Sequence, residues 1–246
     1  MKTKLTAALL IGGLALGGCA TGPYANPNDP LEPMNRSIYA FNEKLDNAVA
    51  KPVATGYRDV VPSPVRTGVS NFFGNLGDLW SSVNAALQLK GEEAGTNFMR
   101  CAVNSTFGLY GLLDIASEMR MQRTRHGLGE TLGVWGVPNG AYVVWPVFGP
   151  STVRNTGAAI LSSGLVDDDQ KINWLHVSEG GTPTAALNIE HASTRTNVGL
   201  LGAVNQRAEL LGVTETLGGL ALDPYAFVRD AYLQREIHKI DQNKSN

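Results

Sequence analysis

Residues 69–91 read VSNFFGNLGDLWSSVNAALQLKG, and this stretch indicates the fold class. Its large apolar residues recur every three or four positions, the spacing of one face of an α-helix; they are Val69, Phe72, Phe73, Leu76, Leu79, Trp80, Val83, Ala86 and Leu87. The opposite face carries Ser, Asn, Gly and Gln, with Asp78 as its only charge before Lys90. A solvent-exposed helix normally carries Lys and Glu there. We therefore expect this polar face to meet something other than bulk water.

The segments on either side of this stretch predict further helices. Apolar residues at helical spacing predict one over about 34–49, carried by Met34, Ile38, Phe41, Leu45 and Val49. We expect Pro52 to end this helix and VPSPVR (61–66) to end its continuation. Other helices are expected from about Glu92 to Val103, within 184–211, and after Asp223-Pro224, which is typical of a helix start.

Residues 130–146, ETLGVWGVPNGAYVVWP, break the helical pattern and predict a β-hairpin that turns at VPNG. Glycine weakens a strand and widens its conformational choices. We interpret residues 128–146 as a moving lid whose large rings are Trp135, Tyr142 and Trp145; the glycines are Gly127, Gly129, Gly133, Gly136 and Gly140. The alternative is a static hairpin with glycines for close packing. The expected fold is mainly α with one short hairpin, a single domain over 31–241 and a polar tail over 242–246.

The N-terminus predicts export and a lipid anchor. Lys2 and Lys4 precede an apolar run over 5–16, as in a secretory signal. The sequence Leu16-Gly17-Gly18-Cys19 resembles the bacterial lipobox, in which cleavage falls before a cysteine that carries diacylglycerol. This predicts a signal peptide over 1–18 and a lipidated tether over 19–30, an ordinary signal being the alternative. Ala20 resembles the sorting signal for the outer membrane, on its periplasmic side.

Composition and motifs argue against several function classes. A formal net charge of −2 argues against nucleic acid as a partner. Cys101 is the one thiol besides Cys19, so we expect no internal disulfide and a buried Cys101. Four histidines lack metal-binding spacing, Ser70 and Ser151 lie outside a G-x-S-x-G motif, and the acidic run 167–169 lacks the rest of a calcium loop. We expect no enzyme, metal or cofactor, and a binding or conduit role.

Several blocks, taken in order over nearly the whole mature chain, resemble the MlaA (VacJ) phospholipid-binding lipoproteins. They are NDPLEPMNRSIYAFNEKLD (28–46), PVRTGVSNFFGNL (64–76), NSTFGLYGLLDIA (104–116), LGETLGVWGVPNGAYVVWPVFGPSTVR (128–154) and ALDPYAFVRDAYLQRE (221–236). The resemblance implies an outer-membrane lipoprotein that removes misplaced phospholipid from the outer leaflet. It also implies a trimeric porin and a soluble periplasmic phospholipid carrier as partners, and a ring of amphipathic helices around a lipid channel.

The resemblance also suggests which residues handle lipid. Phe41 and Asn42 match a Phe-Asn pair that the family places beside the channel. We interpret the polar face of the 69–89 helix as a lining for headgroups; the alternative for its apolar stripe is an ordinary soluble core. The candidate channel or gate residues are Phe41, Asn42, Phe72, Phe73, Leu76, Trp80, Trp135, Tyr142 and Trp145. The chain departs from the family at Ala141 and Asn155, which affects local turn geometry. Rival functions are a structural lipoprotein and a membrane-surface lipid hydrolase.

Overall fold

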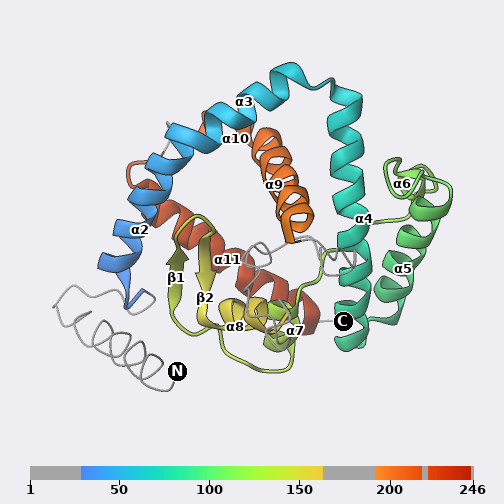
Figure 1. Ribbon diagram of the computed structural model, residues 1–246. Helices are drawn as coiled ribbons and strands as arrows, with labels where there is room; N and C mark the ends of the chain where they lie inside the picture. Colours follow the sequence, from blue (N-terminus) through green and yellow to red (C-terminus); the bar gives the residue numbers. More distant parts are fainter. Residues whose placement is uncertain (1–28, 163–191, 218–220, 245–246) are drawn as a thin grey trace.

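The computed structural model describes residues 29–162, 192–217 and 221–244 (Figure 1). It is mainly helical, as expected, with one two-stranded antiparallel sheet. The elements are α2 (Glu32–Leu45), the π-helix η1 (Asp46–Ala50), α3 (Lys51–Val60), α4 (Ser63–Leu87), α5 (Gly91–Thr106), α6 (Ile115–Glu118), α7 (Leu128–Val134), β1 (Tyr142–Trp145), β2 (Gly149–Thr152), α8 (Val153–Ser162), α9 (Ala192–Glu209), α10 (Leu211–Leu217) and α11 (Pro224–Lys244). The signal peptide, Cys19 and the acidic run 167–169 lie outside the described residues.

Helices α2 and α3 form one continuous rod, joined through η1 (Figure 1). The expectation that Pro52 ends the first helix is therefore wrong. Proline has no N–H, and its ring collides with the carbonyl of the preceding turn. The wider π-turn directly before Pro52 accommodates both effects, so the helix continues. The second expected break is confirmed, because α3 ends at Val60 and Val61 is extended before Pro62.

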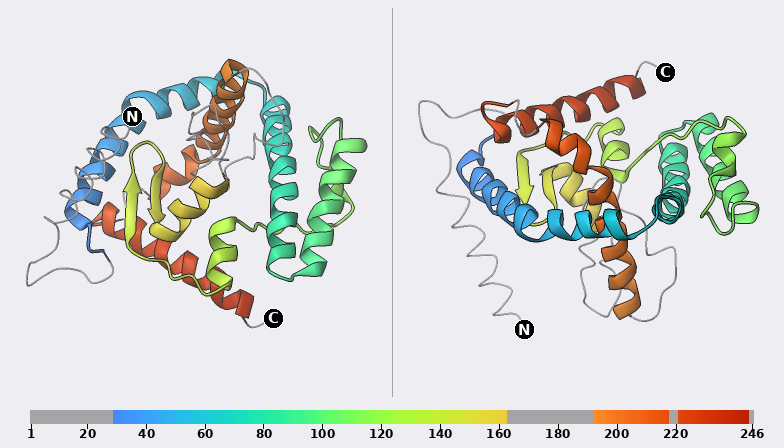
Figure 2. Two further views of the ribbon diagram at one scale, coloured as in Figure 1. Left: turned by 60° about the horizontal axis from the view of Figure 1, so that its bottom comes forward. Right: turned by 90° about the horizontal axis from the view of Figure 1, so that it is seen from above.

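Helices α4 and α5 confirm the helices expected over 69–89 and 92–103; α4 begins earlier than expected and ends at Leu87, and α5 extends further at both ends. They lie side by side, and the short α6 follows at the outer side of α5 (Figures 1 and 2). Leu89 adopts a φ of 63° in the turn between them, and Asp114 caps α6 by accepting a hydrogen bond from the Ser117 backbone. We call α4, α5 and α6, with residues 88–90 and 107–126, the α4–α6 arm.

The hairpin exists, but the expected position of its first strand is wrong. Residues 128–134 form helix α7, and the chain reverses at Pro146–Phe148 rather than at VPNG. Strand β1 pairs with β2 from Tyr142 opposite Thr152 to Trp145 opposite Gly149. Threonine, valine and tryptophan favour strands only weakly, and tertiary contacts override that preference. Here Glu130 and Thr131 are buried in polar contacts with neighbouring elements, as described below.

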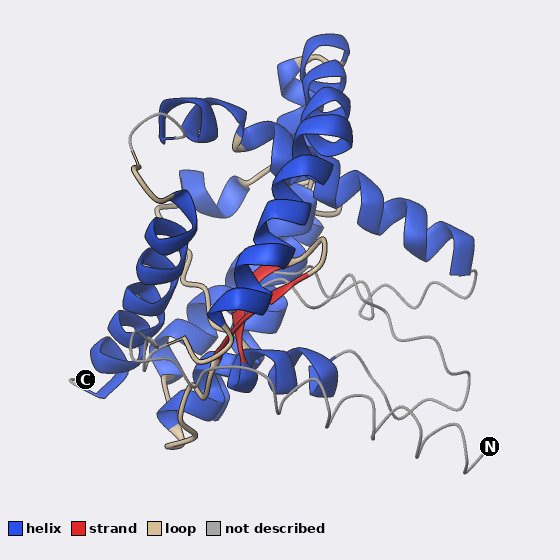
Figure 3. Cartoon of the chain, turned by 90° about the vertical axis from the view of Figure 1, so that its left-hand side faces the viewer, coloured by secondary structure: helices blue, strands red, loops and turns tan. Residues whose placement is uncertain are grey.

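The helices follow one another around a frame. Helix α9 lies against α3 and α4, while α11 crosses behind the hairpin and contacts α7 (Figures 1 and 3). The apolar clusters are small. One joins Ala54, Ala208 and Leu211, and the other joins Tyr142, Val144 and Tyr225 between the hairpin and α11. Helix α11 begins after Asp223, as expected, and continues to Lys244, beyond the expected start of the polar tail.

Candidate functional site

In the described residues many polar side chains are buried and many large apolar side chains are exposed, which is the reverse of an ordinary soluble protein. Polar and charged side chains outnumber apolar ones among the buried residues, and most buried apolar residues are alanines. Large apolar side chains are exposed on nearly every helix. In an ordinary soluble domain Asp, Glu and Arg are almost never fully buried, and broad exposed apolar surfaces mark sites that bind lipid or protein.

Helix α4 shows this reversal most clearly. Its polar residues are buried in the protein, namely Asn75, Asp78, Ser81, Ser82, Asn84 and Gln88. Its apolar stripe is half-buried from Phe72 to Trp80 and exposed at Val83 and Leu87. The expectation that the polar face avoids bulk water is confirmed. Its interpretation as an open lining for headgroups is wrong, because these side chains are covered by α5, α7 and the 107–126 segment.

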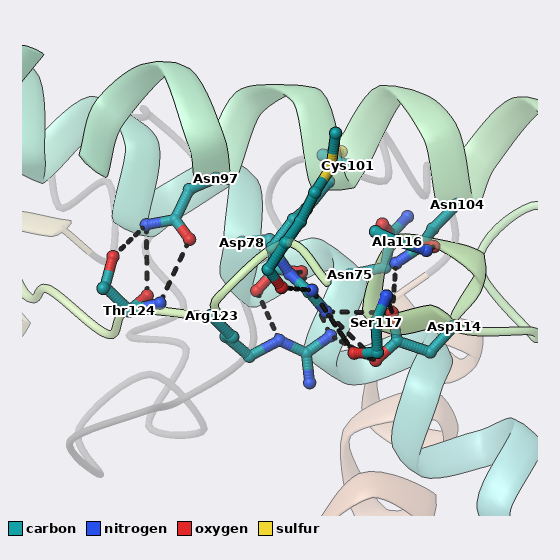
Figure 4. A network of polar contacts seen from close by, with 12 residues as sticks. Asn75, Asp78, Asn97, Cys101, Asn104, Asp114, Ala116, Ser117, Arg123 and Thr124 are labelled. Atoms are coloured by element: carbon teal, nitrogen blue, oxygen red, sulfur yellow. Dashed lines mark hydrogen bonds and ion pairs between the residues drawn. The ribbon is translucent and has the colours of Figure 1, made fainter. Parts of the chain in front are cut away.

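The centre of the α4–α6 arm is an ion cluster around Arg100, which is fully buried on α5. Figure 4 shows the residues Asp78, Asp114 and Arg123 of this cluster. The Arg100 guanidinium lies 3.2 Å from Asp78 of α4 and 2.9 Å from Asp114, and it donates to the Met121 carbonyl. Arg123 approaches Asp78 from the other side at 2.7 Å. The cluster therefore ties the 107–126 segment to both long helices.

Amide side chains complete this polar interior. Asn104 donates to Asp114 and accepts from the Ala116 backbone, and Asn97 exchanges hydrogen bonds with Thr124 in the same way (Figure 4). These amides satisfy backbone groups of a segment that has little secondary structure. The path of residues 114–124 along α5 is consequently fixed by side chains of α5.

Burial and pairing with the guanidinium groups have opposite effects on the pKa values of the two carboxyl groups in this cluster. Burial raises the pKa of Asp78, even though Arg123 and Arg100 both favour its ionised form. At Asp114 burial is outweighed by hydrogen bonds from Ser117 and Asn104 and by the nearby guanidinium groups, so its pKa is lowered. Removing one partner of such a cluster leaves an uncompensated buried charge.

Much of the outer surface of the arm is apolar. Tyr110 is 83% exposed and Leu89 is 93% exposed. The other exposed large apolar side chains of this arm are Val65, Val83, Leu87, Phe98, Met99, Phe107, Leu109, Leu112, Leu113 and Met119. Leu89, Leu109 and Tyr110 also have positive φ values, which L-residues seldom adopt, so the backbone holds these side chains outward at a conformational cost. Within the described residues, none of the helices has the length and apolar character needed to cross a membrane.

The hairpin is attached to the α2 helix by two asparagines. Asn35 is fully buried; its side-chain amide donates to the Tyr142 carbonyl and accepts from the Val144 backbone N–H. The amide therefore bonds to β1 in the way that a neighbouring strand would. Two helical turns later, Asn42 donates to the Trp145 carbonyl at 2.9 Å and accepts from the Val147 backbone at 2.7 Å. Val147 is 66% exposed with a φ of 72°, so Asn42 holds the hairpin turn in a strained conformation.

Comparison with known proteins agrees with this architecture. The family model described as MlaA lipoprotein matches residues 27–239. The chain belongs to the MlaA lipoprotein family. It is 33% identical to the intermembrane phospholipid transport system lipoprotein MlaA of Haemophilus influenzae, over 99% of this chain and 93% of that protein. It is 35% identical to the protein of the same name from Escherichia coli K12, over 96% and 88% of the two chains.

A solved structure described as the structural basis for maintenance of bacterial outer membrane lipid asymmetry has the same fold. It superposes with a TM-score of 0.67 at 31% identity, and the alignment covers 86% of this chain and 98% of that one. Relatives from Rickettsia species without an assigned role also match, such as one from Rickettsia bellii at 28% identity over 84% of this chain. The family resemblance seen in the sequence is thus confirmed.

The candidate residues of this MlaA-family chain divide among three places. Asn42, Tyr142 and Trp145 lie together between α2 and the hairpin, with Phe41 exposed beside them on α2. Phe72 and Phe73 pack edge to face on α4, where Phe73 also meets Gly202 of α9; Leu76 and Trp80 follow on the same half-buried stripe. Trp135 is exposed after α7, and its indole N–H donates to the Leu87 carbonyl.

Two of the glycines expected to allow hinge motion are closely packed. A Cβ on Gly129 would collide with the Asn155 side chain, and one on Gly133 would lie 2.7 Å from Ile240. Both glycines permit α7 to approach α8 and α11 closely. Gly136 and Gly140 have φ values of 96° and 67°, which glycine adopts readily. Motion of the 128–146 segment stays a prediction.

Sequence reasoning missed most of the polar interior. Arg100 and Asn104 lie on α5, whereas Asp114, His126 and Glu236 come from other segments, and no short motif links all five residues. One signal was present, because Asp78 is the single charge on an otherwise neutral helix face. A lone charge in that position indicates a buried partner. Cys101, expected to be buried, is free and half-buried next to Ser105, and no group of metal-binding residues occurs in the described ranges.

Proposed function

We propose that this chain is an outer-membrane lipoprotein, anchored through Cys19 on the periplasmic side, that removes mislocalised phospholipid from the outer leaflet. It passes the lipid to a periplasmic phospholipid carrier and works beside a trimeric porin. Its membership of the MlaA family, whose relatives are named for intermembrane phospholipid transport, supports this proposal. Phospholipid is the transported ligand, and no cofactor takes part.

The observation that carries the proposal is the reversed distribution of polarity. Buried apolar area stabilises a protein in water by about 25 cal/mol per Å², and this driving force vanishes for side chains that face acyl chains. Helices in lipid are held together by close packing and polar contacts instead. The α4–α6 arm has this construction, since its contacts are ion pairs and amide hydrogen bonds while Phe98, Phe107 and Tyr110 face outward.

The same observation suggests how the helices sit. A helix with an apolar face and a strongly polar or charged opposite face lies in the plane of the membrane interface, with its apolar face among acyl chains. We place the rod α2–α3 and the α4–α6 arm in this way within the inner leaflet. Their polar contacts keep the frame open at fixed spacing, so that lipid passes within the frame rather than through the covered polar face of α4.

The proposal includes a non-enzymatic mechanism. Ser70 donates to the Arg66 carbonyl of its own helix α4 and contacts Glu209 and Asn205 of α9, so it helps to hold α4 against α9. Ser151 donates to the Thr152 carbonyl within the hairpin. Neither serine has a histidine partner in the described part of the chain, and a serine nucleophile requires an adjacent base.

The test is restoration of lipid asymmetry in a bacterium that lacks its own MlaA. We expect the wild-type chain to lower outer-leaflet phospholipid, measured by chemical labelling of intact cells. We expect Cys19→Ser to abolish the effect because the protein loses its anchor. Phospholipid should be retained by the protein after gentle detergent purification, as detected by mass spectrometry.

The rival functions give different outcomes in the same experiment. A purely structural lipoprotein would carry no phospholipid and would leave the outer-leaflet lipid unchanged. A lipid hydrolase would release free fatty acid from added phospholipid, at a rate that rises with protein concentration. Either result would overturn the proposed transport role.

A further inference from the structure

A buried histidine joins three helices at the base of the α4–α6 arm. His126 lies directly before α7, and its side chain is 6% exposed. Its Nδ1 lies 2.8 Å from Glu130 of α7, and its Nε2 lies 2.6 Å from Glu93 of α5. Its backbone N–H donates to Ser81 of α4. This one residue therefore connects α4, α5 and α7.

The two contacts of the ring require an additional proton. A neutral imidazole has one N–H, and a carboxylate has none to donate. Both ring nitrogens of His126 nevertheless lie within hydrogen-bond distance of carboxylate oxygens. Both contacts are hydrogen bonds only when the cluster of His126, Glu93 and Glu130 holds one proton beyond the neutral ring. An imidazolium that donates to both carboxylates satisfies this condition.

The charges that face the ring come from two of the three helices. On the α5 side Glu93 also pairs with Lys90 at 3.3 Å, and on the α7 side Glu130 is 6% exposed. Helix α4 presents the neutral Ser81, and the nearest charge on that helix, Asp78, is paired with Arg100 and Arg123. Loss of the extra proton therefore acts mainly on the contact between α5 and α7.

Helix α7 is the junction between the two parts of the molecule. On one side it meets α4, where Thr131 donates to Asn84 and accepts from Gln88. On the other side it contacts α8 and α11 (Figures 1 and 2). We propose that His126, Glu93 and Glu130 form a proton-operated latch, which fixes α7 to the α4–α6 arm while the cluster holds its extra proton and releases the first turn of α7 when that proton is lost.

The direction of the pH dependence follows from the shifts in pKa. Burial lowers the pKa of His126, but hydrogen bonds to Glu130 and Glu93 outweigh burial and raise it. A group with a raised folded pKa stabilises the structure fully below its ordinary pKa, about 6.5 for histidine, and loses this contribution as the pH rises through the folded pKa. The pKa of Glu93 is lowered because its contacts with His126 and Lys90 outweigh burial, so its contribution is lost only in acid.

The experiment uses the full-length lipoprotein in phospholipid nanodiscs. We expect ¹⁵N NMR to show both ring nitrogens of His126 titrating together above the ordinary histidine range. Amide hydrogen exchange over 128–134 should rise with the same midpoint relative to exchange over 225–235 of α11, after correction for intrinsic rates. Each unit of raised pKa corresponds to about a tenfold change in local opening.

Two substitutions and a control separate the latch from a general effect of pH. His126→Gln should remove the pH dependence of exchange in α7, while His238→Gln on the exposed face of α11 should leave it unchanged. If His126→Gln does not fold, Glu93→Gln tests the same point, because losing one negative charge beside the ring should lower the pKa of His126 and shift the midpoint to lower pH.

Three results would overturn the latch. The first is titration of His126 at or below the ordinary histidine pKa, the second is exchange in α7 that follows α11 at every pH, and the third is an unchanged midpoint in Glu93→Gln. None of these readouts involves lipid transport. The latch extends the proposed function, and its failure is distinguishable from a failure of that function.

Discussion

The α4–α6 arm and the hairpin half of the molecule, by which we mean α2, β1, β2, α8 and α11, differ in the apolar residues that they bury. Both parts bury ion pairs, Arg100–Asp78 in the arm and Arg154–Glu236 between α8 and α11. Of the two parts, only the hairpin half has buried aromatic rings among the described residues, where Tyr142 and Tyr225 meet edge to face. The comparison indicates that polar pairing stabilises both parts and that the hairpin half adds an aromatic core.

The two halves should therefore respond differently to mutation. In a soluble core an apolar substitution for a charge is often tolerated, because the charge was costly to bury. In the arm the ion cluster also positions the apolar 107–119 surface, so its loss affects the surface that we assign to lipid. The predictions below test this difference, in order of decreasing expected effect.

Arg100→Met should give the largest loss of stability. It leaves Asp78, whose side chain is 2% exposed, and Asp114 without their central partner. Breaking a buried pair from one side costs about 3–5 kcal/mol. The free energy of unfolding in detergent, measured with denaturant, checks this value.

The matched control for this prediction is Arg58→Met. The Arg58–Asp59 pair is exposed, and such pairs contribute less than about 1 kcal/mol. Arg100→Lys should recover only part of the loss, since lysine lacks the planar fork that reaches several acceptors. Equal effects of Arg100→Met and Arg58→Met would show that the cluster does not hold the arm together.

The sequence predicted α4, α5 and α11 because their apolar periodicity is a local property. It failed where the outcome depends on distant residues. Residues 128–134 are helical because Gly129 and Gly133 fit against α8 and α11 and because Thr131 bonds to Asn84 and Gln88. The π-turn that carries the chain past Pro52 likewise belongs to a rod supported by α9 and the hairpin.

The candidate site was predictable to a smaller degree. Asn42 was identified through the family resemblance, and the structure adds the contacts that explain its position. Asn35 likewise bonds to the backbone of the hairpin, but the sequence gives no sign of this role. Asparagine is common on helices, and only the folded structure shows that a strand edge lies opposite Asn35. The polar face of α4 was recognised as unusual, but its partners lie 12 to 47 residues away in sequence, beyond any local pattern.

Tyr225→Phe and Tyr142→Phe form a matched pair in the hairpin half. The Tyr225 hydroxyl donates to Asp29, which is 1% exposed, so removing it should cost about 1–3 kcal/mol. The Tyr142 hydroxyl is buried without a hydrogen-bond partner among the described residues. Its removal should be neutral or stabilising, since no bond is lost. Thermal unfolding of the two variants checks the difference, and equal destabilisation would contradict it.

Asn42→Ala should have a smaller effect that is confined to the hairpin turn. Two hydrogen bonds to Trp145 and Val147 are lost, with a net cost of about 1–2 kcal/mol. Limited proteolysis near 145–149 should become faster, because the strained Val147 is no longer held. Asn47→Ala, at an exposed position of the same rod, is the control and should leave proteolysis unchanged.

The smallest expected effect on stability comes from a reversible crosslink that tests motion of the hairpin half. In a Cys101→Ser background, which removes the free thiol, Asn42→Cys and Val147→Cys would join α2 to the hairpin turn where the two now share a hydrogen bond. We expect the oxidised protein to be at least as stable as the reduced one, because the bond restores the contact that Asn42→Ala removes. We also expect oxidation to stop lipid transport and reduction to restore it, since a lid must separate from α2 to open. A static hairpin would transport lipid equally well in both states. Full transport with the disulfide completely formed would show that the hairpin is static and that its role is close packing. The arm and the hairpin half would then differ in the residues that they bury but not in whether they move.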